Sequence, residues 1–435
     1  MSCESPKKVV QEFKLFSLAT DPVYIGTGGF TIGRVDNTIV RDPITKLPKI
    51  PGSSLAGTWR YYVTLELLTA IKKLRKEHLN EIIDFLKSEG AISDEEKNSL
   101  ENNKENISTG SFNHIKNSIY EILKLYSDNA EKRKNIHESL KRYFDERLAI
   151  ESLPDNSHSW KYRKYNNFSQ ITCAGQDNVP QEDIKNSPFA TNKDGNTGHC
   201  GHCIVCKGFG FSKKDLSWQG MVYFSDLQIL FFPVFTRLGT KWVTTKEILK
   251  DAGLDNGENP GVAQQFFVAT EKIEDGEQKD YINLGWIYLP YKEEEIFIDL
   301  SKLKFDKFEL KSEDIIIVSE DLFSQIVNSN LEVRTFVSIN PITGAAKEGA
   351  LFTSEAIPRG TIFYGSIRIF NKAFSEEIKS KFGELPTLED LKCALDDSKH
   401  YFETLGIGGM TTRGFGRLKI NFDEVKINEQ NEAQN

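Results

Sequence analysis

The segment IPGSSLAGTWR, from Ile50 to Arg60, joins an extended stretch of chain to a long helical pattern. From Leu55 onward apolar residues recur at intervals of three and four, which predicts an amphipathic helix beginning near Ser53. Ser53 or Ser54 is then expected to be the N-cap, because a serine hydroxyl accepts a hydrogen bond from a free N–H of the first turn. The alternative is that these N–H groups hold a phosphate, with Arg60 following on the same helix.

Composition and charge restrict the class of protein only broadly. The 435 residues are 39% hydrophobic and 27% charged, which is typical of a globular protein. The net charge is −8, yet residues 1–64 contain eight basic and five acidic residues, a local charge of +3, so the overall charge does not exclude a nucleic-acid partner. No apolar run approaches the roughly 20 residues of a membrane span, and MSCESPKKVVQEF lacks the apolar core of a secretion signal. We therefore expect a cytoplasmic protein without membrane contact.

A cysteine cluster predicts a metal site. Cys200, Cys203 and Cys206 form the run HCGHCIVC, and Cys173 lies upstream. In a cytosolic chain, thiols at this spacing indicate metal rather than disulfides, and four protein ligands around a tetrahedral ion leave no position for a reactive water. We expect a structural zinc with Cys173 as the favoured fourth ligand. The rival ligands are three histidines: His158, His199 and His202.

A second glycine-rich stretch, IGGMTTRGFGRLKI at residues 407–420, is a candidate polyanion-binding loop. Glycines allow close approach of the backbone to a ligand, and the guanidinium groups of Arg413 and Arg417 match phosphate geometry. No G-K-[ST] follows, so the loop is not of the nucleotide-binding Walker type.

The order of patterns predicts an α+β fold. Helical patterns extend to about Leu148, residues 150–200 are polar and aperiodic, and strand-like segments dominate from Gly208, without regular β–α–β alternation. We expect four regions: an α+β domain of residues 1–65 and 200–423, a helical insertion at 66–170, a zinc-binding region at 171–207 and a flexible tail at 424–435.

Several stretches together resemble one family. IVRDPITKLPKIPGSSLAGTWR, KEGALFTSEAIPRGTIFYGSI and GGMTTRGFGRL are similar to the RAMP superfamily of CRISPR-associated proteins, especially the backbone subunit of type III effector complexes. MVYFSDLQILFFPVFTRLGTKWVT resembles the Cmr type, whereas RVDNTIVRDP and INPITGAAKEGALF resemble the Csm type equally well. The resemblance covers roughly residues 14–65 and 200–420 and leaves the helical block unexplained.

This resemblance implies a modified ferredoxin-like, RRM-related fold in which the helix start and the glycine-rich loop face the guide RNA. The implied partners are a CRISPR guide RNA, the target RNA, other effector subunits and further copies of the chain. Contacts that hold the RNA backbone suit a guide of any sequence, because base pairing reads the target. The candidate RNA-binding residues are Ser53, Ser54, Arg60, Gly408, Gly409, Arg413 and Arg417.

The resemblance also implies cleavage of guide-paired target RNA, assisted by a divalent metal such as Mg²⁺. Asp36, in the loop before the helix, is the expected catalytic residue, and the alternative for it is an Asx turn with Asn37. Glu355 is the one carboxylate kept where Cmr-type proteins have a Glu-Glu-Tyr-like run, and Tyr24 replaces their histidine. The competing functions are a guide-binding subunit that does not cut, and a guide-processing ribonuclease. The latter would need a histidine near the first strand, whereas His114 and His137 lie in the helical block.

Overall fold

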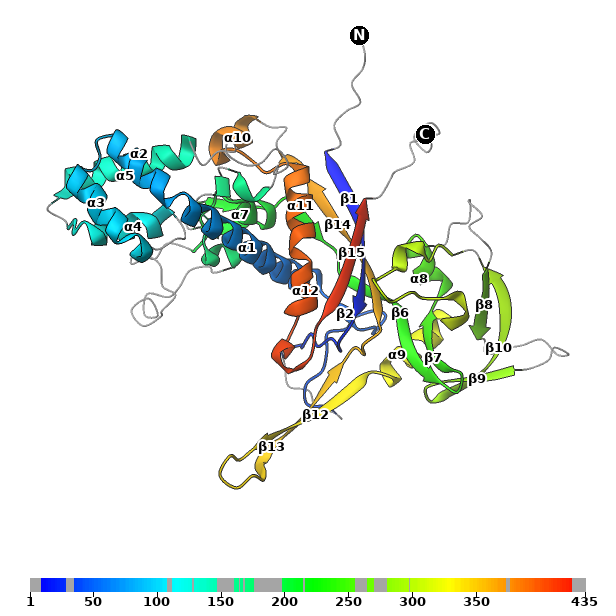
Figure 1. Cartoon of the computed structure of the whole chain (residues 1–435). Helices are drawn as coiled ribbons and strands as arrows, with labels where there is room; N and C mark the ends of the chain where they lie inside the picture. The colour runs from blue at the N-terminus through cyan, green and yellow to red at the C-terminus, as the bar shows by residue number, and fades with distance from the viewer. Residues whose placement is uncertain are drawn as a thin grey trace, which may run out of the picture. The chain divides into compact units, whose positions relative to one another are not determined.

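The computed structural model (Figure 1) describes most of the chain. The described residues are 9–28, 35–107, 112–126, 129–146, 160–163, 165–166, 169–175, 198–213, 216–254, 264–269, 280–296, 298–372 and 376–424. The candidate ligand His158 and the predicted tail beyond Glu424 lie outside these ranges.

The chain divides into two compact units. The helical unit comprises Met1–Gln11, Ala56–Tyr223 and Ile369–Ser398, and the sheet unit comprises Glu12–Leu55, Phe224–Arg368 and Lys399–Asn435. The four regions expected from the sequence have other boundaries than these two units. The division into four regions stays a prediction.

A large mixed sheet forms the framework of the sheet unit. Among the described residues eleven strands join it, in the path β15-β1-β14-β6-β7-β11-β8-β10-β9, with β2 added to β6 and β5 to β14. β11 runs parallel to both of its neighbours, whereas the pairs β1–β15, β6–β7 and β9–β10 are antiparallel. The strands are β1 Val10–Ala19, β2 Lys49–Ile50, β5 Val222–Phe224, β6 Leu227–Thr236, β7 Gly239–Thr244, β8 Gln264–Ala269, β9 Asp280–Leu284, β10 Ile287–Ile296, β11 Ile315–Ile317, β14 Ile362–Phe370 and β15 Leu418–Glu424.

A hydrophobic core packs against this sheet. Phe16, Leu230 and Ile315 from the strands pack with Leu249 of α8 (Lys246–Asp251) and with the segment after β10 that contains Phe305. α9 (Glu320–Ser329) buries Leu322, Phe323, Ile326 and Val327, and α12 (His400–Thr404) contacts β15. A separate antiparallel hairpin is formed by β12 (Glu332–Ile339) and β13 (Ala346–Ala356), and it projects as a long ribbon in Figure 1.

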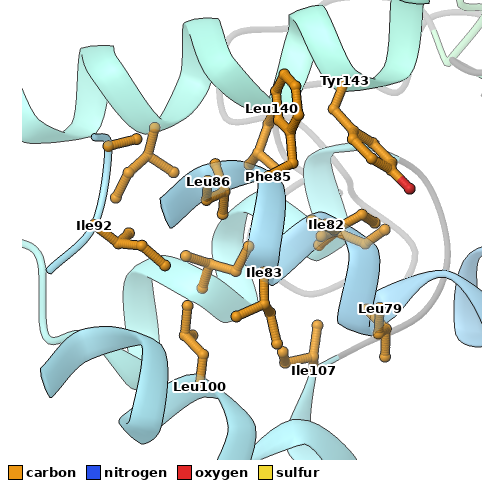
Figure 2. Close-up of a cluster of buried hydrophobic side chains, with 14 of the residues drawn as sticks. Leu79, Ile82, Ile83, Phe85, Leu86, Ile92, Leu100, Ile107, Leu140 and Tyr143 are labelled. Atoms are coloured by element: carbon orange, nitrogen blue, oxygen red, sulfur yellow. The ribbon is translucent and has the colours of Figure 1, made fainter. Parts of the chain in front are cut away.

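The helical unit has a hydrophobic core of its own. It lies among α2 (Leu79–Ser88), α3 (Asp94–Asn102), α4 (Phe112–Ile122) and α5 (Ala130–Glu146). Figure 2 shows Leu140 and Tyr143 of α5 directed toward Phe85 and Leu86 of α2. Ser93 caps α3 through a capping box with Glu96, which explains why the helix starts there.

The helical unit contains further helices and a short hairpin besides this core. α1 (Gly52–Glu77) begins in the sheet unit and continues into the helical unit, where the Trp59 indole N–H donates to the Leu395 carbonyl of α11 (Leu388–Ser398) over 3.1 Å. The others are α7 (Ile204–Phe209), α10 (Glu376–Phe382) and the hairpin of β3 (Phe211–Lys213) with β4 (Leu216–Trp218).

The predicted α+β class is therefore confirmed, including a helical region and a strand-rich C-terminal half. None of the described helices is both long and apolar enough to cross a membrane.

Candidate nucleic-acid interface and metal centre

An aspartate from a distant part of the chain occupies the start of α1. The helix begins at Gly52, and the Gly52 N–H donates to Asp226 Oδ1 over 2.8 Å. The Lys49 ammonium lies 2.6 Å from the other carboxylate oxygen of Asp226. The expected serine cap is therefore wrong: Ser53 and Ser54 lie inside the first turn, and the capping carboxylate comes from the segment before β6.

The same junction explains the glycine of the opening motif. A Cβ at Gly52 would lie 2.7 Å from the Phe224 carbonyl oxygen, which is closer than side chains approach. Burial alone would raise the pKa of Asp226, but hydrogen bonds from Lys49 and Gly52 lower it below its ordinary value. An internal anion thus already binds the positive end of the helix.

The other candidate residues of α1 differ in their surroundings. Ser53 is exposed and Ser54 half-buried. The Arg60 guanidinium contacts two groups of the helical unit: its Nε donates to the Cys173 carbonyl over 2.8 Å, and its Nη2 lies 3.0 Å from His199 Nδ1. Arg60 thereby ties α1 to the cysteine region, and its role toward RNA remains a prediction.

The loop that contains Asp36 is fastened to β13. Asp36 Oδ2 accepts hydrogen bonds from the Thr353 N–H at 2.7 Å and the Thr353 hydroxyl at 3.0 Å. Asn37 forms a parallel bridge with Ser354, with N–H donation to the Thr353 carbonyl over 3.0 Å. The Asp36 side chain is fixed in position by a neighbouring strand although the residue is exposed.

These bonds set the protonation state of Asp36. Donation from the Thr353 backbone N–H, with the hydroxyl adding to it, lowers the pKa of the Asp36 carboxyl. The carboxylate is therefore ionised at neutral pH and is a weak proton acceptor there. Its chemistry suits binding a cation or orienting a donor better than abstracting a proton.

Glu355, the second candidate carboxylate, has a different environment. Its Oε1 lies 2.7 Å from Arg41 Nη2, and Arg41 also donates to Asn328 Oδ1 over 3.0 Å. The second oxygen, Oε2, is buried and accepts no hydrogen bond from any described residue. Glu355 N–H donates to the Asn37 carbonyl over 3.0 Å, so the same backbone pairing places both candidate carboxylates beside the loop.

The glycine-rich loop approaches the chain's own backbone very closely. Gly408 has a φ of 83°, and a Cβ there would lie 2.3 Å from the Tyr24 carbonyl oxygen. The Gly409 N–H donates to that same carbonyl over 3.0 Å, and the Gly416 N–H donates to the Pro22 carbonyl over 2.8 Å. Gly408 and Gly409 are thus explained by packing against Tyr24, and Gly416, with a φ of 83°, by packing against Ile407, whether or not RNA also lies near.

The two arginines of this loop are not equivalent. Arg417 lies 2.8 Å from Asp21 Oδ2 in an ion pair, whereas Arg413 is exposed, with its guanidinium 6.0 Å from the centre of the Phe336 ring. Arg413 therefore presents the less restrained charge for a phosphate.

An aromatic cluster beside this loop was missed by sequence reasoning. The Phe336 and Phe352 rings stack at 5.1 Å with an interplanar angle of 16°, and Phe415 lies 6.0 Å from Phe336. The Arg334 guanidinium lies 4.8 Å from the Phe415 ring. Phe352 directly precedes Thr353, so the cluster adjoins the Asp36 loop. The sequence signal for this cluster is the turn NPITG between two apolar runs. This pattern indicates a hairpin, and the hairpin pairs Phe336 with Phe352.

The four cysteines come together in the helical unit. The Sγ atoms of Cys173, Cys200, Cys203 and Cys206 all lie within 4.8 Å of one another. Backbone N–H groups of His202 and Cys203 point to Cys200 Sγ at 3.4 and 3.3 Å, in a turn that Gly201 permits with a φ of 80°. Four soft thiolate donors, three of them buried and Cys200 half-buried, fit a tetrahedral zinc ion, and this arrangement is consistent with a zinc site.

The two rival histidines that the structure describes lie outside this group of sulfur atoms. His199 Nδ1 is 4.0 Å from Cys206 Sγ but only 3.0 Å from the Arg60 guanidinium, and His202 is exposed. Hydrogen-bond contacts with Cys200, together with burial, raise the pKa of the Cys173 thiol, because the neighbouring sulfur atoms and the buried surroundings disfavour its charged form. A bound divalent cation would favour the thiolate forms instead.

Comparison with known proteins agrees with the resemblance noted in the sequence. The model of the RAMP superfamily matches residues 18–419, so the chain belongs to this superfamily. It is 26% identical over 235 residues to the CRISPR system Cmr endoribonuclease Cmr4 of Pyrococcus furiosus, covering 50% of this chain and 74% of the relative.

Relatives of the Csm type match shorter stretches. The CRISPR system Cms endoribonuclease Csm3 of Enterococcus italicus is 39% identical over 75 residues, covering 16% of this chain and 35% of the relative. The match to the solved structure of oligomeric Cmr4 from Pyrococcus furiosus covers 96% of this chain and 99% of that chain, with 16% identity and a TM-score of 0.36. The expected relation to both Cmr-type and Csm-type proteins is confirmed.

We predict that Asp226→Asn lowers the free energy of unfolding by about 1 kcal/mol at pH 7, the scale of a lost helix cap. The amide keeps the shape but lacks the charge that faces Lys49 and the helix dipole. Because the folded-state pKa lies below the ordinary 3.8, this contribution is complete above that value and is lost as pH falls through the folded-state pKa. Urea denaturation should show wild type and variant converging in acid.

Asp280→Asn, at an exposed position of β9, is the control for this experiment and should leave the unfolding free energy unchanged at both pH values. A difference between Asp226→Asn and wild type that persisted in acid would mean that the charge of Asp226 is not what stabilises the junction.

We predict about one zinc per chain, lost together with stability in Cys203→Ser, because a closed thiolate site contributes folding energy. The melting temperature should fall by about 10 °C or more. Cys393→Ser is the matched control, since Cys393 lies outside the cluster, and it should keep its zinc. Metal analysis of the purified wild type that found no zinc would refute the assignment.

Proposed function

We propose that the chain is a guide-RNA-binding backbone subunit of a type III CRISPR effector complex that cuts guide-paired target RNA at the loop of Asp36. Membership of the RAMP superfamily and the similarity to proteins named Cmr4 and Csm3 support the class. The observation that carries the cutting role is an exposed, ionised Asp36 carboxylate that two hydrogen bonds from Thr353 hold in place. The partners would be guide RNA, target RNA, other effector subunits and further copies of the chain, in the cytoplasm.

In this proposal the chain positions RNA and controls charge around one phosphodiester. Arg413 binds backbone phosphates near the glycine-rich loop, and the Phe336–Phe352 pair offers a flat surface for a base. Asp36 orients the 2′-hydroxyl nucleophile or the ion next to it, and Thr353 restricts its rotation. Ser53, Ser54, Gly408, Gly409 and Arg417 are assigned to the guide backbone on the resemblance alone.

The residues present fit a hard divalent cation such as Mg²⁺. Asp36 supplies an exposed oxygen ligand that is already ionised, whereas the Glu355 carboxylate is engaged by Arg41. Asp36 would therefore hold the ion, which when bound would supply charge stabilisation at the phosphate.

The second candidate is a guide-binding subunit that does not cut. The Arg41–Glu355 ion pair favours it. The hydrogen bonds from Thr353 to Asp36 favour it too, because the same bonds would hold the loop against β13 in a subunit that does not cut.

We predict that Asp36→Asn reduces target cutting by at least about 100-fold while guide and target binding are retained, the scale of one lost catalytic group. Asparagine keeps the size and the acceptor oxygen for Thr353 but not the charge. The measurement is cleavage of labelled complementary RNA by the reconstituted complex with Mg²⁺, with binding followed in parallel.

Asp42→Asn is a control from the same loop, because Asp42 accepts from the N–H groups of Ile44 and Thr45 as a turn residue and asparagine can do the same. Thr353→Val should cut more slowly and Thr353→Ser should restore the rate, since only serine keeps the hydroxyl. Full cutting by Asp36→Asn would favour the non-cutting subunit, and loss of binding with cutting would assign Asp36 to the fold.

Replacing Arg413 by alanine should weaken RNA binding equally for unrelated guides, because phosphate contacts carry no sequence information. The slope of log affinity against log salt should become shallower by about 0.7, the value for one contact on a single strand. Arg417→Ala should act in the same direction, with the loss of the Asp21 ion pair added. A change in preference between guides would contradict backbone binding.

A further inference from the structure

The cysteine cluster is built from two arms of the helical unit. One arm is the turn of residues 170–175, which carries Cys173, and the other is the segment of residues 198–206, which carries the remaining three cysteines. The Gly198 carbonyl of the second arm accepts hydrogen bonds from the Thr172 hydroxyl and from Gln170 Nε2, the latter over 2.6 Å. These bonds fasten the two arms to each other at Gly198.

Arg60 of α1 joins the same two arms a second time. Its Nε donates to the Cys173 carbonyl over 2.8 Å, and its Nη2 lies 3.0 Å from Nδ1 of the buried His199. A guanidinium has donors only, so the His199 Nδ1 accepts and the neutral ring carries its proton on Nε2. Because the N–H groups of arginine form a rigid planar fork, Arg60 fixes one group of each arm relative to the other.

His199 lies at the edge of the sulfur cluster. Its Nδ1 is 4.0 Å from Cys206 Sγ, and the Cys200 Sγ is 3.9 Å from that same sulfur. Sulfur ligands of a tetrahedral zinc ion are about 3.8 Å apart, given a zinc–sulfur bond of about 2.3 Å. The nitrogen is thus almost as close to Cys206 as a fellow ligand would be, and the lone pair that could bind metal is the one that accepts from Arg60.

We propose that Arg60 is a positioning residue of the metal centre, which holds the Cys173 arm in place and keeps His199 Nδ1 away from the metal, so that zinc takes four thiolates. A zinc ion with four thiolates carries excess negative charge, and the half-buried Arg60, whose two partners are neutral, compensates part of it. Removing Arg60 would loosen Cys173 and release His199 with one change. The inference rests on the zinc assignment and is independent of Asp36 and of RNA cutting.

The first test measures zinc affinity of the full-length protein by competition with a chromogenic chelator. Arg60→Ala should weaken zinc binding about 10- to 100-fold, the scale of a lost outer-shell partner. Arg60→Lys should recover part of this loss, because the ammonium keeps the charge and can donate to the Cys173 carbonyl. The control Arg142→Ala removes a guanidinium of the same unit that pairs with Glu89, and it should stay within about twofold of wild type.

The second test replaces zinc by cobalt(II), whose absorption reports the ligands. Wild type should give the spectrum of four thiolates. In Arg60→Ala the d–d bands should move to shorter wavelength, because imidazole is a stronger-field ligand than the thiolate it replaces. Arg60→Ala/His199→Phe should return to the four-thiolate spectrum. If Arg60 served only to pack the fold, its loss would lower the melting temperature without changing the set of ligands.

Wild-type zinc affinity or a wild-type cobalt spectrum in Arg60→Ala would overturn the proposal, and so would an equal loss of affinity in Arg142→Ala. The zinc-saturated variants are also titrated with fluorescein-labelled poly(U) RNA, where the proposal expects the wild-type salt slope. A slope shallower by about 0.7 together with wild-type zinc affinity would make Arg60 an RNA contact instead. Wild-type protein that bound no zinc would remove this proposal and leave the proposed function standing, whereas full cutting by Asp36→Asn would do the reverse.

Discussion

The hydrogen bond from the Gly52 N–H to the Asp226 carboxylate joins the start of α1 to the sheet, and the neighbouring contacts of the sheet unit depend on it. Asp226 immediately precedes β6, and Lys49, which binds the same carboxylate, belongs to β2, the strand that pairs with β6. A helix start, two strands and an ion pair therefore meet at one side chain. Only glycine fits at position 52 because the Phe224 carbonyl lies against it, so the small residues of the opening motif serve chain packing first.

In the loop of Asp36, too, one contact positions several side chains. Its backbone pairs with β13, and this pairing simultaneously fixes Asp36 against Thr353 and brings Arg41 to Glu355. The two candidate carboxylates have different surroundings: Asp36 is exposed and bound by neutral donors, and Glu355 is paired with a guanidinium. Any difference in chemical role between Asp36 and Glu355 therefore follows from these partners and not from the type of residue.

Local patterns predicted what depends on local physics. The helix of residues 52–77, the strand-rich C-terminal half and three of the four clustered cysteines follow from periodicity and spacing within short windows. The Asp226 cap could not be found in this way, because its donor and acceptor are 174 positions apart. The Arg41–Glu355 pair, 314 positions apart, and the Phe336–Phe415 contact depend on the sheet having formed. The glycines of the loop also have a packing reason that local patterns did not reveal, since Gly408 and Gly409 meet Tyr24 of the same chain, and their role toward RNA stays a prediction.

The lowered pKa of Asp36 bears on how a ribonuclease of this design would work. A general base is most effective when its pKa is near the working pH, and donation from Thr353 moves Asp36 away from that condition. A cation ligand has the opposite requirement, since it must be ionised and held still before the cation arrives. Thr353 supplies both properties at once through its N–H and its hydroxyl. Under the proposed function, Asp36 would therefore bind an ion and orient the nucleophile, and it would not be the group that removes the proton from the 2′-hydroxyl.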